Sequence, residues 1–512
     1  MDGNYPKVPK YFLYVLFILG SWLLICLLHF RQPLFQLSGS GVVVILPFSR
    51  HASSSAPDDD RLSTPSSSSC DGRYVHMVDL PPQFDVCAEG SPAFNSEHSI
   101  CPLMSNAGLG PVLTPAGNHS DDGDAGIVPN TGWYNTNQYA LEVIFHHRVR
   151  LYECLTEDPV AAAAVYVPYY PAMELHPHTC GLFNATVRDG ASEQLLRWLS
   201  SRPAWAALGG RDHFMVASKT SWMFRREVVD GGDDTGCGNS FLVQPESRNM
   251  TVLTYETVIW ERPQQDFAVP YPSYFHPSSA GEVAEWQARM RAAPRPWLFA
   301  FAGARRPNGT LAIRDRIFDA CDAAPPRRSC GKLDCGHGLE GSITCRSPRK
   351  LMSLFASSRF CLQPPGDSFM RRSSVDAVMA GCIPVFFHEA STFEQQYRWH
   401  ERDPDSERNG RSNNDRRYYV FIDQDDVLQG KVNIEEALSR YTDGEVAGMR
   451  EEVIKMIPRF LYKDPRVRFA GDMRDAFDIT IDEVIARISR IKNGENLGRT
   501  YYSDGAVIAN GS

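Results

Sequence analysis

The densest chemical signal in the sequence is a loop of small residues and arginines that is followed by an apolar stretch with helical spacing. It covers residues 363–384 and reads QPPGDSFMRRSSVDAVMAGCIP. Such a loop, at the end of a strand and the start of a helix, presents free backbone N–H groups and the positive end of a helix dipole. That arrangement suits a diphosphate, and Arg371 and Arg372 would add positive charge beside it.

The candidate donor-binding residues in this segment are Gly366, Asp367, Ser368, Arg371, Arg372 and Asp376. Asp376 lies four residues beyond Arg372, so both project from one helical face, where a carboxylate can accept hydrogen bonds from ribose hydroxyls. The composition also fits a capped surface helix, with Asp367 or Ser368 as N-cap and an exposed ion pair of Arg372 with Asp376. The loop has neither G-x-G-x-x-G nor the Walker pattern, which disfavours a dinucleotide or ATP site.

Two adjacent arginines follow another predicted strand, at residues 297–302. The stretch FAFAGARR ends in Arg305 and Arg306, and its small residues allow a ligand to approach closely. A guanidinium group holds phosphate oxygens in a bidentate fork. A solvated basic turn is the alternative reading, but two phosphate-suited loops in one sheet favour a diphosphate site.

Alternating helices and strands must position these loops. The second half is expected to contain a helix from Pro348 to about Ser357, a strand at 359–363, a helix to Ala380 and a strand at 383–387, which form one β-α-β unit. The first half is expected to contain strands at 73–80, 161–167 and 213–217 and helices at 139–151 and 193–199. Such alternation predicts α/β domains with parallel sheets covered on both faces. A last helix is predicted at 482–492, with Thr480 and Glu483 as its capping box.

The length and charge of the chain bound its class. With 512 residues the chain exceeds one ordinary core, and two domains plus tails are expected. The net charge of −9 provides no basic field, so no nucleic-acid partner is expected.

The N-terminal region has the composition of a membrane anchor and a stem. Residues 11–28 are apolar and uncharged, and such a run is about long enough to cross a bilayer as a helix. We expect a signal-anchor, with a cytosolic tail at 1–10 and a stem rich in Ser, Pro and Asp at 29–72. A cleaved signal peptide is the alternative. The residues at 496–512 are expected to form a disordered tail.

Cysteines and glycosylation sequons place the body in an oxidising lumen. Sequons occur at Asn118, Asn184, Asn249 and Asn308, and twelve cysteines lie between residues 70 and 382. Cys321, Cys330, Cys335 and Cys345, with His337 among them, admit either a zinc site or disulfides. Because their spacings contain no C-x-x-C pair, disulfides are expected and no metal site is predicted.

Several ordered motifs resemble the plant branch of the exostosin-type glycosyltransferases, in particular the xyloglucan galactosyltransferases. They are RYVHMVDLP at 73–81, GWYNTNQY at 132–139, YVPYY at 166–170, GRDHFMV at 210–216, PYPSYFHP at 270–277, FAGAR at 301–305 and the loop and helix that end in GCIPVFF at 381–387. The resemblance runs from about residue 70 to about residue 491.

The resemblance implies a GT-B fold in which two Rossmann-like domains face a cleft, with an acceptor-side domain at 73–275 and a nucleotide-sugar-binding domain at 276–495. It implies an inverting hexosyltransferase that moves galactose from UDP-galactose to xylosyl side chains of xyloglucan, with no metal or other cofactor. Carried over by motif, Arg305 is implied as a diphosphate contact and Asp376 as a ribose contact. A single-pass type II protein of the Golgi membrane is expected, with its catalytic body in the lumen and other glycosyltransferases as candidate partners.

An inverting displacement also needs a general base. Asp212 and His213 are the leading candidates, because they start a predicted strand in the acceptor-side domain; a buried structural histidine is the alternative. Two further residues are candidate substrate contacts. His276 lies between aromatic and proline residues and could instead be a packing residue, and Glu142 pairs at i, i+4 with His146 on a helix face that could instead be solvated.

Alternatives within and outside this class stay open. The same scaffold could use UDP-galacturonic acid or an arabinosyl donor, since one pocket residue can change recognition at C6 or C5 of the sugar. A catalytically silent, glycan-binding Golgi protein is the reading from a different class. Intact Arg305 and Asp376 argue against it.

Overall fold

The computed structural model describes residues 70–113, 126–180, 184–226, 236–260, 265–306, 312–323, 329–336, 345, 347–402 and 417–495. They fall within one compact unit. The predicted cytosolic tail, membrane span and C-terminal tail, nearly all of the predicted stem, and Asn118, Asn308 and His337 lie outside them. Of the helices in these ranges, none combines the length and the apolar character that a membrane crossing requires.

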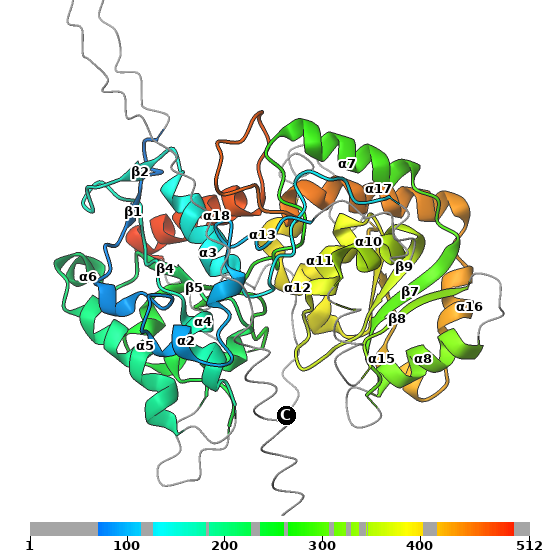
Figure 1. The fold of residues 1–512 in the computed structure, drawn as a ribbon, viewed down its shortest axis with the longest axis horizontal. Coiled ribbons are helices and arrows are strands. Elements are labelled where there is room, and N and C mark those ends of the chain that lie inside the picture. Colours follow the sequence, from blue (N-terminus) through cyan, green and yellow to red (C-terminus); the bar gives the residue numbers. More distant parts are fainter. Residues whose placement is uncertain are drawn as a thin grey trace, which may run out of the picture. The chain divides into compact units, whose positions relative to one another are not determined.

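The first half of the described chain forms a six-stranded parallel sheet, here called the N-terminal sheet, with the order β2-β1-β3-β4-β5-β6. Its strands are β1 (Val75–Met77), β2 (Leu155–Thr156), β3 (Ala164–Tyr166), β4 (His213–Val216), β5 (Thr251–Thr254) and β6 (Asp266–Ala268). The α-helices of this half are α2 (Pro92–Asn95), α3 (Leu141–Arg150), α4 (Pro171–Leu175), α5 (Ala185–Ser200) and α6 (Pro203–Leu208) (Figure 1). Short 3-10 helices lie at Pro82–Phe84, Cys101–Leu103, His176–His178, Ser221–Phe224, Phe241–Val243 and Ser247–Asn249.

The second half forms a five-stranded parallel sheet, here called the C-terminal sheet, with the order β11-β10-β9-β7-β8. Its strands are β7 (Trp297–Gly303), β8 (Cys330–Asp334), β9 (Ser358–Gln363), β10 (Ile383–Phe386) and β11 (Val420–Phe421). The helices are α7 (Ala280–Ala292), α8 (Ile313–Ala323), α10 (Pro348–Ala356), α11 (Arg372–Met379), α12 (Phe393–Gln396), α13 (Arg398–Glu401), α15 (Gln424–Leu428), α16 (Ile434–Ser439), α17 (Asp443–Phe460) and α18 (Ala476–Lys492), with a 3-10 helix at Glu389–Ser391. The two parallel sheets confirm the predicted α/β class.

The order of the C-terminal strands reverses at β7. The next strand along the chain, β8, pairs on one side of β7, and β9 pairs on the other. In open parallel sheets, ligands bind beyond the carboxyl ends of the strands, where the order reverses. That point lies beyond Gly303 of β7 and Gln363 of β9, and the two arginine-bearing loops start there.

The predicted β-α-β unit is confirmed, because local sequence signals and burial agree there. The side chain of Ser347 caps α10, β9 and β10 are adjacent and parallel, and Gly381 ends α11 at φ 58°. This left-handed conformation costs other residues roughly 1–2 kcal/mol, which explains the glycine. A disulfide from Cys361 of β9 to Cys382 joins the two strands of the unit.

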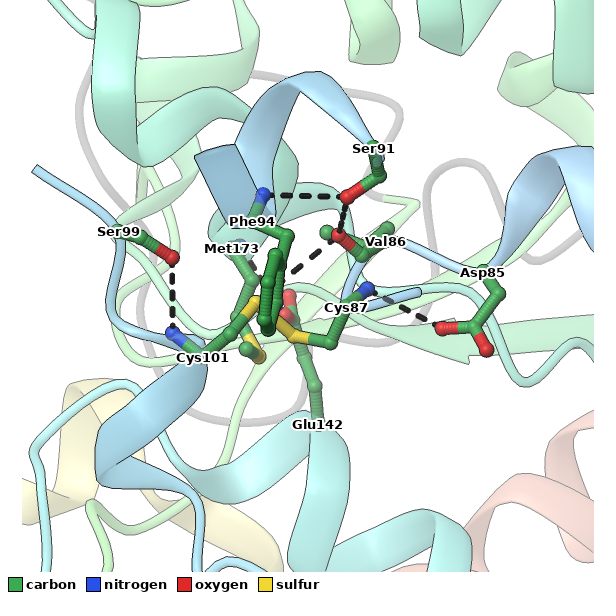
Figure 2. The surroundings of a disulfide bond; sticks show 9 residues. All are labelled: Asp85, Val86, Cys87, Ser91, Phe94, Ser99, Cys101, Glu142 and Met173. Atoms are coloured by element: carbon green, nitrogen blue, oxygen red, sulfur yellow. Dashed lines mark hydrogen bonds between the residues drawn. A yellow bond between two sulfur atoms is a disulfide. The ribbon is translucent and has the colours of Figure 1, made fainter. Parts of the chain in front are cut away.

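The prediction of disulfides is confirmed in six pairs. They are Cys70–Cys154, Cys87–Cys101, Cys180–Cys237, Cys321–Cys330, Cys335–Cys345 and Cys361–Cys382. Figure 2 shows the second of these with the residues around it. The Ser91 hydroxyl accepts from Phe94 N at 3.1 Å and donates to Val86 O at 2.6 Å, so local hydrogen bonds hold this short loop.

The last helix, α18, returns to the N-terminal sheet, as Figure 1 shows in red beside α3 and β1. Arg487 Nε donates to Thr251 Oγ1 of β5 at 3.2 Å, and the Lys492 ammonium donates to the carbonyl oxygen of Ala163 at 3.0 Å. The predicted second domain, 276–495, includes α18, whereas in the structure α18 packs on the sheet of the first half. The predicted capping box at Thr480 and Glu483 is also wrong, since the helix begins earlier.

The observed capping box of α18 consists of Asp475 and Asp478. Asp475 is fully buried and forms an ion pair with Arg148 of α3, with Nη1 and Oδ2 2.6 Å apart. The sequence pattern at Thr480 lacked this information, because the start of the helix is fixed by a partner more than three hundred residues away.

Candidate functional site

A cluster of arginines lies where the strand order reverses between β7 and β9. Arg314 of α8 is 4% exposed, and its Nε donates to Pro365 O at 3.1 Å. Its Nη2 is buried and has no hydrogen-bond partner among the described groups. Burial, with smaller contributions from the Arg371 and Arg306 guanidinium groups, lowers the pKa of Arg314 to about 9 against the opposing effect of Asp367. We call Arg306, Arg314 and Arg371 the arginine cluster.

The loop after β9 is shaped around this cluster. Gly366 N donates to Ser368 O at 2.9 Å, which closes a tight turn. A Cβ atom at Gly366 would overlap the Arg371 guanidinium and lie 2.6 Å from Arg314 Nη2. Only glycine therefore lets both guanidinium groups approach the loop, and the exposed Asp367 is the acidic residue beside them. Converging cations with a free buried donor fit a diphosphate.

The structure does not bring Arg305 into the arginine cluster. Its Nη1 and Nη2 pair with Asp319 and Asp322 of α8, at 2.9 and 2.8 Å, and its guanidinium lies over the Phe318 ring. These interactions hold Arg305 on the outer face of α8. Arg306, one residue later, is the arginine of the FAGARR turn whose charge reaches the cluster.

A carboxylate from the N-terminal sheet contacts the loop between β9 and α11, residues 364–371, here called the donor loop after its predicted role. Glu256, just beyond the carboxyl end of β5, accepts a hydrogen bond from Met370 N at 2.6 Å and is 4% exposed. Burial raises the pKa of Glu256 to about 7, although hydrogen bonds from Met370, Phe369 and Ser368 lower it. Sequence reasoning missed this residue; the available signal was an acidic residue immediately after a buried strand.

Asp376 and Arg372 lie between the two halves of the described chain. Asp376 is 1% exposed, and burial raises its pKa to about 6. It accepts from the Ser273 hydroxyl at 2.7 Å, and Arg372 Nε is 3.7 Å from its carboxylate. Arg372 also lies 3.7 Å from the centre of the Tyr274 ring. The alternative of an exposed ion pair on a surface helix is therefore wrong, because this pair is buried against the segment after β6.

Asp212 and His213 lie far from these groups along the fold. They form the amino end of β4, where His213 Nδ1 and Asp212 Oδ1 are 2.8 Å apart and the imidazole packs on Trp205. Parallel sheets bind ligands at the opposite, carboxyl end. The structure therefore places Asp212 and His213 away from the end of the sheet where a catalytic base is expected. The alternative interpretation, a buried structural histidine, fits His213 better.

His276 and Glu142 both have their polar atoms engaged within the protein. His276 is 1% exposed; its Nδ1 lies 2.8 Å from Tyr462 O and its Nε2 lies 3.0 Å from Thr136 Oγ1. Burial lowers the pKa of His276 to about 4, so the ring is a neutral link between segments. His276 is therefore a buried packing residue, as the alternative interpretation predicted.

Glu142 is fully buried at the start of α3, close to the disulfide drawn in Figure 2. Its carboxyl oxygens accept from Ala172 N, Met173 N and Ser218 N at 2.8 to 3.2 Å. Both the predicted substrate contact and the solvated face are wrong for this position, because Glu142 holds the start of α4 and the turn after β4. Burial nevertheless raises its pKa to about 8.

The turn after β4 also carries a lysine that sequence reasoning missed. Lys219 is 5% exposed, and its ammonium lies 4.4 Å from the centre of the Tyr139 ring. Burial lowers the pKa of Lys219 to about 8, against the opposing effect of Glu142. Burial is the main cause that raises the pKa of Tyr139, and the nearby Asp367 carboxylate raises it as well. The carboxyl ends of the two sheets therefore meet around the donor loop.

Two of the predicted glycosylation sequons lie in described segments. The Asn184 side chain is exposed and accepts from Val187 N at the start of α5, and Asn249 is exposed with its Nδ2 donating to Gly209 O. Both positions are at the surface, as a glycan requires, and their occupancy stays a prediction.

Comparison with known proteins gives a consistent result. Residues 69–438 match the model of the exostosin GT47 domain. The chain is 40% identical over 435 residues to xyloglucan galactosyltransferase MUR3 of Arabidopsis thaliana, which covers 85% of this chain and 65% of that protein. It is 37% identical to the probable xyloglucan galactosyltransferase GT12 of the same plant (85% of this chain, 81% of that protein) and 33% identical to xyloglucan-specific galacturonosyltransferase 1 (82% and 58%).

Two solved structures show weak similarity. The GtfA/B complex matches with a TM-score of 0.29 and 10% identity, over 59% of this chain and 60% of that one. The pneumococcal O-GlcNAc transferase GtfA with UDP and GlcNAc matches with a TM-score of 0.25 and 9% identity, over 59% of each chain. At these scores neither contributes to the argument.

Proposed function

This chain belongs to the exostosin GT47 family, and on that premise we propose that it is an inverting glycosyltransferase that moves galactose from UDP-galactose to xylosyl side chains of xyloglucan. The chain spans about two thirds of the length of its relative MUR3, at 65%. The proposed architecture is GT-B, with the nucleotide-sugar on the C-terminal sheet and the acceptor on the N-terminal sheet. The proposed location is the Golgi membrane, with a single type II span and a lumenal body.

The arginine cluster is the observation that supports this proposal most directly. The guanidinium groups of Arg371 and Arg314 lie against Gly366, with a free buried donor on Arg314, and the charge of Arg306 acts on both. This is the edge of the sheet where ligands of such folds bind. Like charges so arranged repel one another, and a bound anion would offset this repulsion more than Asp367 alone does. The diphosphate of a nucleotide-sugar supplies two negatively charged groups, and each can accept a bidentate pair of hydrogen bonds from a guanidinium group.

The arrangement also explains how the donor bond would break. The acceptor hydroxyl attacks the anomeric carbon and gives up its proton to a general base, while the bond from that carbon to the diphosphate oxygen breaks, so negative charge grows on the leaving UDP. Preorganised cations at that position stabilise the transition state more than the ground state. Glu256 acts here as a positioning residue, because it holds the backbone of the loop that carries Met370.

No metal is needed in this proposal, because the arginine cluster would neutralise the leaving group. The test is sugar transfer by the full chain with a panel of UDP-sugars and xyloglucan oligosaccharides, followed by mass analysis, with and without a chelator. A hexosyl gain that survives the chelator supports the proposal. A hexuronosyl gain would instead support the activity named for the galacturonosyltransferase relative. Absence of any gain, with bound UDP detected, would favour a silent glycan-binding protein.

A further inference from the structure

A second cavity, which the donor site does not use, opens at the carboxyl ends of β10 and β11. Its volume is about 570 Å³, within the roughly 300–1,000 Å³ typical of sites for small ligands. Tyr419, Phe421 and His388 supply rings to its lining, and Glu389, Asp425 and Gln424 supply oxygens. We call it the β10–β11 cavity.

The β10–β11 cavity lies next to the donor loop. The ring of His388, directly after β10, is 4.4 Å from the ring of Phe369, and Phe369 in turn contacts Trp260 at 5.5 Å. Trp260 is 60% exposed and comes from the segment after β5, close to Glu256. The cavity is therefore separated from the arginine cluster by one strand and one loop, and an exposed aromatic side chain of the other half lies beside it.

The lining combines flat apolar rings with hydrogen-bond acceptors. The Phe421 ring is 45% exposed, so one face can receive a ligand. The Oε1 of Gln424 is buried and has no hydrogen-bond partner in the described part of the chain. Aromatic faces together with carboxylate and amide oxygens match a sugar ring, whose C–H face is apolar and whose hydroxyl groups donate hydrogen bonds.

The charge of the lining narrows the class of ligand. Glu389, Asp423 and Asp425 surround His388 closely enough to raise its pKa, although burial has the larger, opposite effect. None of the ion pairs among the described residues includes these three carboxylates. Their charge would repel a phosphate or a uronic acid and favours an uncharged polyol.

We propose that the β10–β11 cavity is a subsite for an uncharged saccharide, and that its carboxylates exclude a uronic acid. This inference rests on the proposed transferase function, because it names the sugar that the site accepts. The same chemistry describes the galactosyl group of the donor and a neutral glycosyl unit of the xyloglucan acceptor. The two sources are distinguished by which ligand loses affinity when the cavity is altered.

The test compares binding and transfer by the full chain and three variants. Glu389→Gln with Asp425→Asn neutralises two exposed carboxylates, Phe421→Ala removes the exposed ring, and Asp472→Asn is a matched control at an exposed acidic residue outside the cavity. Saturation-transfer NMR and titration calorimetry use UDP, UDP-galactose, UDP-galacturonic acid and a neutral xyloglucan oligosaccharide.

Both cavity variants should bind UDP with wild-type affinity, which shows that the fold and the diphosphate site are intact. Their affinity for either the oligosaccharide or UDP-galactose should fall about tenfold or more, as expected for one or two lost bonds to charged acceptors or one lost stacking contact. The neutralised variant should also discriminate less against UDP-galacturonic acid. The control should match the wild type.

Unchanged affinity of both cavity variants for every sugar ligand would overturn the inference. An equal loss in the Asp472→Asn control would overturn it as well, since the effect would then be unrelated to the cavity. Failure of the proposed function looks different, because the unaltered chain would then transfer no sugar from any donor, whatever the cavity variants bind.

Discussion

Replacement of Arg314 by methionine should separate binding from folding, because the two effects have opposite signs. The lowering of the pKa of Arg314 from 12.5 to about 9 corresponds to about 5 kcal/mol against the charged form, at 1.36 kcal/mol per pKa unit. Methionine removes this cost and retains the aliphatic volume. It loses the bond from Nε to Pro365 O, which contributes about 1 kcal/mol.

The expected net effect without ligand is a gain of about 1–3 kcal/mol in the free energy of unfolding, because relaxation of the native protein reduces the electrostatic cost. The sign with pH follows from the direction of the shift. A base whose pKa is lowered on folding destabilises the native state fully below its folded pKa, here about 9, and the destabilisation then declines as the pH rises toward the unfolded value of 12.5. The gain should therefore be present at pH 7 and shrink toward pH 10.

The effect on donor binding should be a loss. A charge-assisted hydrogen bond to a phosphate oxygen contributes about 1.5–3 kcal/mol, so the Kd for UDP should rise about 10- to 150-fold. Thermal unfolding with and without UDP measures both quantities, since the stabilisation by a bound ligand rises with the logarithm of the ligand concentration divided by its Kd. Arg316→Met, at an exposed position on the same helix, is the matched control and should change neither.

A structural role for Arg314 would give the reverse pattern. In that case Arg314→Met would lower Tm in the absence of ligand and leave the Kd for UDP within twofold of the wild type. That pair of results would refute the assignment of the arginine cluster to a diphosphate.

Three further predictions concern Gly366, Glu256 and Asp475. Gly366→Ala should raise the Kd for UDP at least tenfold with little change in Tm, because a Cβ would force the arginines away from the loop; calorimetric titration measures it, and unchanged affinity would contradict it. For Glu256, whose pKa is raised on folding, stability relative to Glu256→Gln should be greatest below about pH 4.5 and fall by about 3 kcal/mol as the pH rises through about 7; urea unfolding at several pH values measures it, and a flat difference would count against it. Asp475→Ala should destabilise the protein by about 3–5 kcal/mol, because it leaves Arg148 buried without its main partner; a loss below 1 kcal/mol would show that α18 is held otherwise.

Local signals in the sequence were sufficient to predict the helices and strands of the β-α-β unit at 348–387. Ser347 and Pro348 start α10, Gly381 ends α11, and the apolar run after it forms β10, because each of these positions is decided by backbone preference and burial nearby. The parallel α/β class followed from the same alternation. The start of α18 was wrong because Asp475 responds to Arg148 across the fold.

The candidate site was harder to predict, since the function of an arginine depends on where its side chain points. Arg305 and Arg314 are both arginines near the same strand end, yet one pairs with Asp319 at the surface and the other is buried without a full set of partners. A sequence motif gives the position of Arg305 but not the presence of two aspartates one turn apart on α8. Glu256 was missed for the same reason, because its partner Met370 lies 114 residues further along the chain.

The balance of charge around Gly366 is what gives the arginine cluster its meaning. Some buried cations of this protein have carboxylate partners, as Arg148 has Asp475 and Arg226 has Asp189. Others do not: Lys219 lies over the Tyr139 ring, and Arg295 donates to backbone carbonyl oxygens. Around Gly366 the cations face one another instead, with Asp367 exposed at the side. Folding alone gains nothing from that arrangement, since apolar residues of the same size would pack there at lower cost. In the proposed function an anionic diphosphate would complete the arginine cluster, and this predicts both the gain in stability and the loss of UDP affinity expected for Arg314→Met.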